Sequence, residues 1–306
     1  MTSAVAWMNG EFIDYQTMAV PVWDLGIVAG ASITEMARTY GHQPFRFELH
    51  LDRLLQACVE LKFSVPYSAA ELLSAANEVV TANTASLSPS SDLGVVAFIT
   101  AGANPTYLGS GPLPPATVGI HSFELPFGLW VKAATNGVKL VTTSIRQHDQ
   151  QDFPVHLKVR NRLHWWLADQ QAREIQPDAK ALLLDAKDRI TETSTAAFYA
   201  VIDGEVVTPK ANVLNSMSRQ LVCEATAAAG IPFVVRDLTL QQLEQATECF
   251  VSSTPVGILP VASVNDTVFG VGSNDSVIAQ LLSHWQVQTG TNPIQQLHDY
   301  EAHAAD

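Results

Sequence analysis

The sequence predicts a two-lobed protein of the α+β or α/β class, and three observations lead to this prediction. The chain has 306 residues, which is enough to build two hydrophobic cores. Apolar residues make up 47 % of it and charged residues 15 %, a balance typical of folded globular proteins rather than disordered ones. Short β-rich runs and amphipathic helical runs also alternate in both halves of the chain.

The first half, residues 1–122, is expected to form a small N-terminal α/β domain. Asn9-Gly10 lies between two apolar runs and predicts a hairpin over residues 5–13, because both residues tolerate positive φ. A glycine-bearing turn then leads into a predicted helix over residues 31–40. The other expected elements are a short strand at 44–47, helices at 50–63 and 68–82, strands at 93–100 and 117–122, and a Gly- and Pro-rich loop at 102–115.

Residues 123–134 are predicted to connect two domains, because Pro126 and Gly128 interrupt the regular pattern there. Residues 135–306 are expected to form a larger mixed α/β domain that binds the cofactor described below. Its expected strands lie at 138–145, 180–185, 232–236, 249–254 and 258–264, its hairpin at 190–208, and its helices at 160–174, 216–229, 239–246 and 276–288.

The composition excludes several classes of partner. The chain has 17 Lys and Arg against 30 Asp and Glu, and a net charge of −13 disfavours nucleic acid and anionic membrane surfaces. Three scattered cysteines are too few for a disulfide framework and favour a reducing compartment. The sequence shows neither a signal-peptide pattern nor an apolar run of membrane-spanning length. We therefore expect a soluble, cytoplasmic protein that acts on small molecules.

Lys158 stands alone between an apolar, strand-like run and a predicted helix. Most lysines are solvated surface residues, so its role depends on the other polar features of the sequence. Three of these suit a phosphate group. Met217 and Ser218 open a helix, whose first N–H groups and positive dipole end attract anions. Thr254 follows an apolar strand and offers a hydroxyl, and Arg53 lies on an otherwise apolar helix, where its planar guanidinium can bind an anion.

Other catalytic patterns are weak or missing in the sequence. There is no G-x-S-x-G elbow, no Walker loop and no G-x-G-x-x-G motif after a strand. His148, His156 and His164 recur every eight residues, which matches neither one helical face nor a usual zinc motif. We predict no metal site, and we expect these histidines to be surface or packed side chains.

Taken together and in this order, these features resemble the fold-type IV family of enzymes that depend on pyridoxal 5′-phosphate. The family includes branched-chain aminotransferases, D-amino-acid aminotransferases and aminodeoxychorismate lyases. The resemblance covers nearly all of the sequence, from Asn9 to Gly290, and its specificity lies in the joint pattern. The matching motifs are the N-G hairpin, the glycine turn, the H-x-x-R-L helix at 50–54, the lysine at 158 and the Thr191-Glu192-Thr193-Ser194 run.

The resemblance implies a two-lobed α+β fold and a pyridoxal 5′-phosphate cofactor. Lys158 would hold the cofactor aldehyde as a Schiff base (an aldimine) and then act as a general base. Glu192 would pair with the pyridine nitrogen and keep it protonated, so that the ring works as an electron sink. Family members are dimers, so the resemblance also implies a homodimer. The residues that match the family's phosphate ligands are Arg53, Met217, Ser218 and Thr254.

The motifs do not agree with one branch of the family. Residues 158–163 have the K-x-x-N-R-L form of the lyases and D-amino-acid enzymes, whereas branched-chain aminotransferases have K-x-x-x-N-Y. Residues 34–38, by contrast, resemble the F-E-G-I-R motif of the branched-chain enzymes. The strand that ends in Thr100-Ala101-Gly102 lacks the arginine with which lyases and D-amino-acid enzymes meet a substrate carboxylate. The arginines that could replace it are Arg38, Arg160 and Arg162.

The leading hypothesis is an aminotransferase of the branched-chain type, which moves an amino group between an amino acid and a 2-oxo acid through Lys158. The alternative is an aminodeoxychorismate lyase that releases pyruvate and 4-aminobenzoate. A further alternative is a degenerate, non-catalytic homologue, since a fold alone does not establish an activity. A substrate amine without a carboxylate would also be consistent with the missing arginine.

Overall fold

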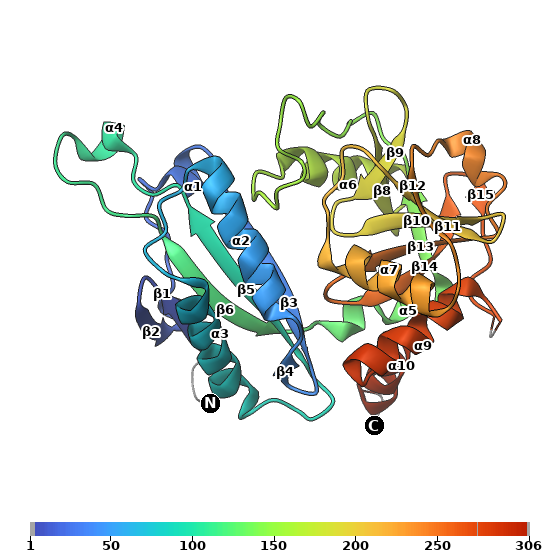
Figure 1. Ribbon diagram of the computed structural model, residues 1–306, viewed down its shortest axis with the longest axis horizontal. Helices are drawn as coiled ribbons and strands as arrows, with labels where there is room; N and C mark the ends of the chain where they lie inside the picture. Colours follow the sequence, from blue (N-terminus) through green and yellow to red (C-terminus); the bar gives the residue numbers. More distant parts are fainter. Residues whose placement is uncertain (1–3, 274, 305–306) are drawn as a thin grey trace. The chain divides into compact units, whose positions relative to one another are not determined.

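The computed structural model describes residues 4–273 and 275–304 (Figure 1). It divides into two compact units. Met1–Leu125 and Leu157–Asn161 form the first unit, whereas Pro126–His156 and Arg162–Asp306 form the second. The polypeptide therefore passes between the units three times, and the short segment that carries Lys158 packs with the N-terminal residues. The sequence pattern groups this segment with the second half of the protein instead.

The first unit is built on a six-stranded sheet in the order β2-β1-β6-β5-β3-β4, with antiparallel neighbours throughout. The β1–β2 hairpin turns at Asn9 and Gly10 with φ of 50° and 98°, as predicted from the Asn-Gly pair. The strands are β1 (Val5–Met8), β2 (Glu11–Asp14), β3 (Ser32–Tyr40), β4 (Gln43–Pro44), β5 (Leu93–Thr100) and β6 (Val118–Glu124).

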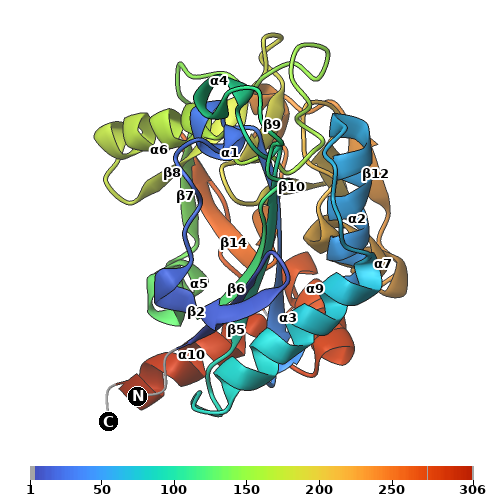
Figure 2. The ribbon, with the colours of Figure 1, turned by 90° about the vertical axis from the view of Figure 1, so that its left-hand side faces the viewer.

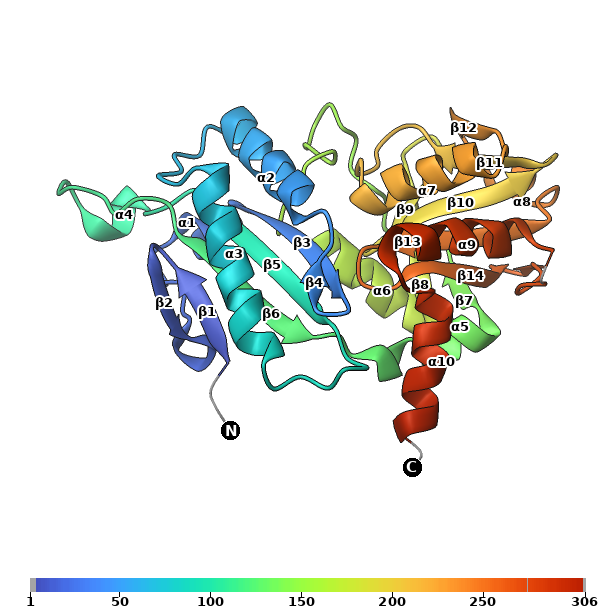
Figure 3. The same ribbon diagram turned by 60° about the horizontal axis from the view of Figure 1, so that its bottom comes forward.

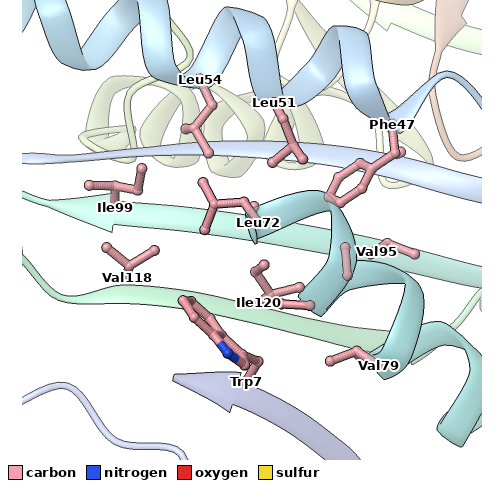
Figure 4. Close-up of a cluster of buried hydrophobic side chains, with 14 of the residues drawn as sticks. Trp7, Phe47, Leu51, Leu54, Leu72, Val79, Val95, Ile99, Val118 and Ile120 are labelled. Atoms are coloured by element: carbon pink, nitrogen blue, oxygen red, sulfur yellow. The ribbon is translucent and has the colours of Figure 1, made fainter. Parts of the chain in front are cut away.

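Two long helices, α2 (Phe47–Leu61) and α3 (Ala69–Thr84), cover one face of this sheet (Figures 2 and 3). Ser68 and Glu71 form the capping box that starts α3, and their reciprocal bonds satisfy two backbone donors of the first turn. The core lies between helices and sheet, where Leu51 and Leu54 of α2 point toward strand residues such as Ile99 (Figure 4). The unit also contains the short helices η1 (Tyr15–Thr17), α1 (Leu25–Val28) and α4 (Pro105–Leu108).

The helix predicted over residues 31–40 is wrong, because this segment is the strand β3. It pairs in register with β5 from Ser32↔Thr100 to Arg38↔Gly94. Both faces of β3 carry buried residues, so the two-residue alternation that identifies a half-exposed strand is hidden in the sequence. The tertiary pairing overrides the local helical signal, and Gly41 ends the strand in a hairpin rather than a helix.

The second unit is built on a nine-stranded sheet, six of whose strands close into a ring. Its path is β12-β11-β10-β13-β14-β7-β8-β9, and β9 also pairs with β10, which closes the ring from β10 to β9. A closed ring leaves no open edge among its members. The strands are β7 (Val138–Val141), β8 (Ala179–Leu184), β9 (Ile190–Thr193), β10 (Ala197–Ile202), β11 (Glu205–Pro209), β12 (Phe233–Arg236), β13 (Glu248–Ser253), β14 (Gly257–Val264) and β15 (Thr267–Val268).

The helices of the second unit pack around this ring. α6 lies on β8 around the buried Trp165, and α7 packs against α9 and β13. The final helix α10, which the sequence pattern does not indicate, packs against α5 and β14. The helices are η2 (Phe127–Leu129), α5 (Val131–Asn136), α6 (Leu163–Ile175), α7 (Met217–Ala228), α8 (Leu240–Leu243), α9 (Val277–Thr289) and α10 (Pro293–Ala304).

Most other predicted elements are confirmed to within a few residues. The structure adds detail in three short segments. The expected strand at 44–47 is reduced to β4, because Phe47 already begins α2. The expected connector at 123–134 contains η2 and the first part of α5, and the expected loop at 102–115 contains α4. Pro and Gly mark reversals of the backbone, but a single helical turn fits between them without any periodicity to reveal it.

Across the described residues, the structure contains no helix of the length and apolarity that a membrane crossing requires.

We predict that Leu72→Ala destabilises the protein by about 3 kcal/mol, because it deletes a fully buried side chain at the centre of the first core. The free energy of unfolding in urea measures the change. Val59→Ala is the matched control, since Val59 on the outer side of α2 is 72 % exposed and its truncation leaves stability within about 0.5 kcal/mol. Equal losses in the two variants would contradict this view of the core.

Candidate functional site

Lys158 is held by its backbone against the edge of β3. Its carbonyl accepts the N–H of Thr34 at 3.0 Å, and the N–H of Arg160 donates to the carbonyl of Ser32 at 2.9 Å. Val159 and Ile33 form an antiparallel bridge between these two bonds. Val159 packs against the core under α2 and α3, and its N–H donates to the carbonyl of Leu157 at 3.0 Å, which makes a tight turn at Lys158. Two backbone hydrogen bonds and one isolated bridge therefore tie the Lys158 segment to the edge of β3, although the segment is not itself a strand.

A buried carboxylate, Glu35 on β3, organises the polar residues near this edge. Its oxygens accept bonds from Arg53 Nε at 2.6 Å, from Arg53 Nη2 at 2.7 Å and from His50 Nδ1 at 2.8 Å. Burial alone raises the pKa of the Glu35 carboxyl, but the bonds from His50 and Arg53 and the charges of Arg53 and Lys158 outweigh it and lower the pKa to about 2. Glu35 is therefore ionised at neutral pH.

His50 and Arg53 reach Glu35 from the same face of α2, because residues three apart in a helix are neighbours. Burial lowers the pKa of His50, although its bond to Glu35 acts in the opposite direction. A neutral imidazole that donates from Nδ1 fits this position. The sequence predicts Arg53 as a possible phosphate ligand but does not predict its partner. The available signal is a lone acidic residue in a β-rich run combined with His and Arg at helical spacing.

Glu192 on β9 is oriented by two donors in the second unit. Its Oε1 accepts the backbone N–H of Leu214 at 3.2 Å and Nε2 of Gln147 at 3.4 Å. The side chain of Gln147 is itself held in place, because its Oε1 accepts the N–H of His148 at 3.0 Å and meets His164 Nε2 at 3.2 Å. Burial, with His148 and Arg162 nearby, lowers the pKa of His164 to about 4, so this ring is neutral and donates from Nε2. The sequence pattern gives no signal for Gln147.

Hydroxyl groups gather at the N-terminus of α7. Ser216 caps the helix by accepting the N–H of Arg219 at 3.1 Å, and its hydroxyl lies 3.1 Å from that of Ser218. The Ser218 hydroxyl is also 3.1 Å from Ser252 Oγ, which in turn lies 2.9 Å from the hydroxyl of buried Tyr199. The first N–H groups of a helix, here those of Met217 and Ser218, have no carbonyl partner within the helix.

The end of β13 therefore lies beside the start of α7. Ser252 near this end contacts Ser218 directly, and Thr254 follows the last residue of the strand at a half-buried position. The pairing of β13 with β10 at Ala197↔Ser252 fixes this arrangement. Two segments that the sequence marks as suited to a phosphate group, around 216–218 and 252–254, thus come together in the second unit.

The three candidate arginines have different surroundings. Arg38 is buried, and it binds Asp92 at 3.1 Å and the carbonyl of Thr39 at 2.9 Å, with its guanidinium 4.1 Å from the centre of the Tyr40 ring. This buried ion pair commits Arg38 to the fold of the first unit. Arg162 donates to the carbonyl of Ser194 at 3.0 Å. Arg160 is exposed, and its guanidinium lies 5.0 Å from the centre of the Phe98 ring.

In the described part of the chain, no three His, Cys, Asp or Glu side chains are grouped so that they could hold a metal ion. The His148 and His164 rings lie 4.3 Å apart, whereas His156 is exposed.

Comparison with known proteins identifies the family. The family model described as amino-transferase class IV matches residues 32–264, which is most of the chain. The chain belongs to the class IV aminotransferase family. The predicted membership is therefore confirmed. The D-alanine aminotransferase of Staphylococcus haemolyticus is 26 % identical over 277 residues, which cover 90 % of this chain and 94 % of that protein.

Solved structures of aminotransferases share the fold. The branched-chain aminotransferase of the archaeon Thermoproteus uzoniensis, solved with norvaline, superposes with a TM-score of 0.82 at 26 % identity, covering 94 % of this chain and 95 % of that one. The branched-chain amino acid aminotransferase of T.th., complexed with N-(5′-phosphopyridoxyl)-L-glutamate, gives a TM-score of 0.82 at 24 % identity, with 95 % of each chain covered. These similarities confirm the predicted α+β, fold-type IV class.

The residues present fit a phosphorylated pyridine. Ser218, Ser252 and the first turn of α7 supply hydroxyl and N–H donors around one point, which is the chemistry that a phosphate dianion requires. The Glu192 carboxylate, fixed by Gln147 and Leu214, suits a protonated ring nitrogen. The fit rests on donor type and placement within the second unit.

We predict that Glu35→Gln lowers stability at neutral pH and flattens the acid dependence of unfolding. The carboxylate has its pKa lowered from 4.5 to about 2, so it contributes about 3 kcal/mol above pH 4.5, which is lost as the pH falls toward 2. The stability difference between wild type and variant should therefore shrink steadily below pH 4.5.

Urea unfolding at pH 7, 4 and 3 measures this difference. Asp52→Asn, which removes an exposed carboxylate from the same helix, is the control and should leave the pH dependence close to that of the wild type. A difference between wild type and Glu35→Gln that stays constant from pH 7 to pH 3 would show that the Glu35 charge is not held as described.

Proposed function

We propose that this protein is a pyridoxal-phosphate-dependent aminotransferase that exchanges an amino group between a branched-chain-like amino acid and a 2-oxo acid. One observation carries the proposal: a class IV aminotransferase match that spans residues 32–264 and includes Lys158, whose backbone is bonded to the edge of β3. The family assignment supports the reaction class. The substrate, the residue roles and a homodimeric assembly are the parts that we propose.

Met217, Ser218 and Thr254 bind the cofactor phosphate in this proposal, and Arg53 contributes positive charge. Ser218 is suited to this role because its hydroxyl is already aligned by Ser216 and Ser252. Donors that are fixed before the ligand arrives lose less entropy on binding. Arg53 is 18 % exposed, and its bidentate bond to Glu35 keeps the guanidinium in one orientation.

Pyridoxal phosphate, when bound, supplies an aldehyde that accepts the amino group and a ring that withdraws electrons from the substrate α-carbon. Lys158 Nζ binds that aldehyde in the resting enzyme. Once released from the aldehyde, Nζ would carry the proton from the substrate α-carbon to C4′ of the cofactor. The fixed backbone of residues 158–160 limits how far Nζ moves between these tasks.

Glu192 holds a proton on the ring nitrogen, where positive charge makes the ring a stronger electron acceptor. Its carboxylate must face the nitrogen throughout the reaction. The bonds from Gln147 and the Leu214 backbone prevent it from rotating, and His164 fixes Gln147 in turn. Preorganised charge of this kind costs no reorganisation during the reaction.

Two observations support an amino acid as the substrate. Similar proteins named as D-alanine and branched-chain aminotransferases match this chain at the same 26 % identity. Residues 34–38 resemble the branched-chain motif, which favours that group. The lyase alternative rests on the K-x-x-N-R-L form of residues 158–163.

A half-reaction without a 2-oxo acid tests the function. Protein loaded with pyridoxal phosphate is mixed with L-leucine, L-valine, D-alanine or buffer, and the absorption spectrum reports conversion of the cofactor from its aldehyde to its amine form. We expect conversion with at least one branched-chain amino acid.

Lys158→Ala should slow this conversion about a thousand-fold and prevent borohydride from fixing the cofactor to the protein. Lys132→Ala is the control, because Lys132 is 73 % exposed and pairs only on the surface with Asp178.

The outcomes separate the alternatives. A coloured protein that no amino acid converts, but that releases pyruvate from aminodeoxychorismate, is a lyase. A colourless protein that borohydride cannot modify at Lys158 is a non-catalytic homologue. Conversion by D-alanine alone would reject the branched-chain assignment while leaving the aminotransferase reaction intact.

We also predict that Glu192→Gln slows the half-reaction about 100-fold while borohydride still fixes the cofactor at Lys158. An amide cannot hold a proton on the ring nitrogen, but it preserves the size of the side chain. Glu174→Gln on the exposed side of α6 is the matched control and should react at the wild-type rate. If the Glu192→Gln variant reacts at the wild-type rate, Glu192 does not take part in the proposed chemistry.

A further inference from the structure

A hydroxyl network, formed by Tyr199, Ser252, Ser218 and Ser216, runs from the core of the second unit to the start of α7. The hydroxyl of Tyr199 on β10 lies 2.9 Å from Ser252 Oγ on β13, and Ser252 donates to Ser218 Oγ at 3.1 Å. Ser218 Oγ in turn lies 3.1 Å from Ser216 Oγ, at the N-cap of α7. Tyr199, Ser252 and Ser218 are buried, and Ser216 is half-buried. The network therefore joins an inaccessible phenol to the end of a helix.

The pairing of β10 with β13 fixes the buried end of this network. Tyr199 lies opposite Phe250, and the two rings are stacked with their centroids 4.6 Å apart and their planes at 7°. Ser252 is two residues beyond Phe250, so alternation along the strand puts both side chains on the same face of the sheet. Phenylalanine at position 199 would keep this stacking and lose only the hydroxyl. Packing alone therefore does not require the phenol.

The network has a direction. Ser252 has one hydroxyl proton and gives it to Ser218, so it can only accept in its contact with Tyr199. Burial raises the pKa of the Tyr199 phenol, although its bond with Ser252 acts in the opposite direction, so the phenol keeps its proton and donates it. Four hydroxyl groups joined by three contacts thus leave one proton at the α7 end, on Ser216 or Ser218.

The remaining proton adds to the donors at the start of α7. The first backbone N–H groups of a helix have no carbonyl partner within it, and Ser216 already accepts that of Arg219 at 3.1 Å. A doubly ionised phosphate ester accepts hydrogen bonds but donates none, so it binds where protons are presented to it. A freely rotating hydroxyl loses entropy when a ligand orients it, whereas the bond from Ser252 fixes the Ser218 oxygen beforehand.

We propose that Tyr199 is a positioning residue for the cofactor phosphate, on which it acts through Ser252 and Ser218. This inference rests on the proposed function, in which Ser218 binds that phosphate, and deepens it by adding a buried residue behind the site. The phenol donates to Ser252, Ser252 donates to Ser218, and Ser218 donates to a phosphate oxygen. Hydrogen bonds arranged in this way polarise one another, so the phenol strengthens the donor at the far end.

The test compares two ligands that differ only in the phosphate. The dissociation constants of pyridoxal phosphate and of pyridoxal are measured for the full chain, as wild type and as Tyr199→Phe. We expect the variant to bind pyridoxal phosphate about fivefold more weakly, the scale of one neutral hydrogen bond, and pyridoxal less than about twofold more weakly. A role in packing alone would weaken the binding of both ligands alike.

A double-mutant cycle separates a connected network from independent contacts. Ser252→Ala should weaken the binding of pyridoxal phosphate about tenfold, and adding Tyr199→Phe should not increase this loss, because the phenol acts only through Ser252. Independent effects would multiply to about 50-fold and would contradict the inference. Thr226→Val is the control, since it removes a buried hydroxyl of α7 that donates to the Cys223 carbonyl, and it should leave both dissociation constants within about twofold of the wild type.

The results distinguish this inference from the proposed function. If Tyr199→Phe weakens both ligands equally or neither, or if the wild type does not prefer pyridoxal phosphate to pyridoxal, the positioning role is overturned whatever the half-reaction shows. If no amino acid converts the wild-type cofactor but Tyr199→Phe selectively weakens the phosphate-bearing ligand, the aminotransferase proposal fails and the role of Tyr199 stands. Pyridoxal serves as the internal reference for each variant, so a general loss of stability does not imitate a selective loss.

Discussion

The backbone pairing of residues 158–160 with the edge of β3 is the constraint on which the chemistry of the first unit depends. Two hydrogen bonds and one antiparallel bridge fix the backbone on both sides of this pairing. The same pairing places Val159 against the core, whereas the guanidinium of Arg160 lies 5.0 Å from the centre of the Phe98 ring. This short segment thereby carries the proposed reactive amine on a fixed backbone.

The buried Glu35 carboxylate gives this edge its electrostatic character. An isolated charge inside a core is very costly, and here it is compensated by a bidentate bond from Arg53 and a bond from His50. These bonds hold the guanidinium of Arg53 in one orientation, which suits its proposed role beside the cofactor phosphate. Gln147 acts similarly in the second unit, where it holds Glu192 and is held by His164.

The second unit brings hydroxyl groups of two distant segments together, and these form the proposed phosphate site. The capped start of α7 and the end of β13 meet through the hydroxyls of Ser218 and Ser252, with Tyr199 buried behind them. The closed ring of strands fixes both segments, since β13 is paired on each side. Helix-end donors and hydroxyls are thus set in place before any ligand binds, which lowers the entropic cost of binding.

The sequence by itself determined the Asn9-Gly10 hairpin, the capped helix at Ser68 and the family, because turn chemistry, capping and motif order are local properties of a polypeptide. It also singled out Lys158, Glu192 and Ser218 as residues for testing. Only the tertiary structure decided that residues 32–40 form a strand, that Glu35 holds Arg53, and that Arg38 is buried while Arg160 is exposed. Those facts depend on which segments pair and pack across long separations, and local periodicity does not encode such contacts when both faces of a strand are buried.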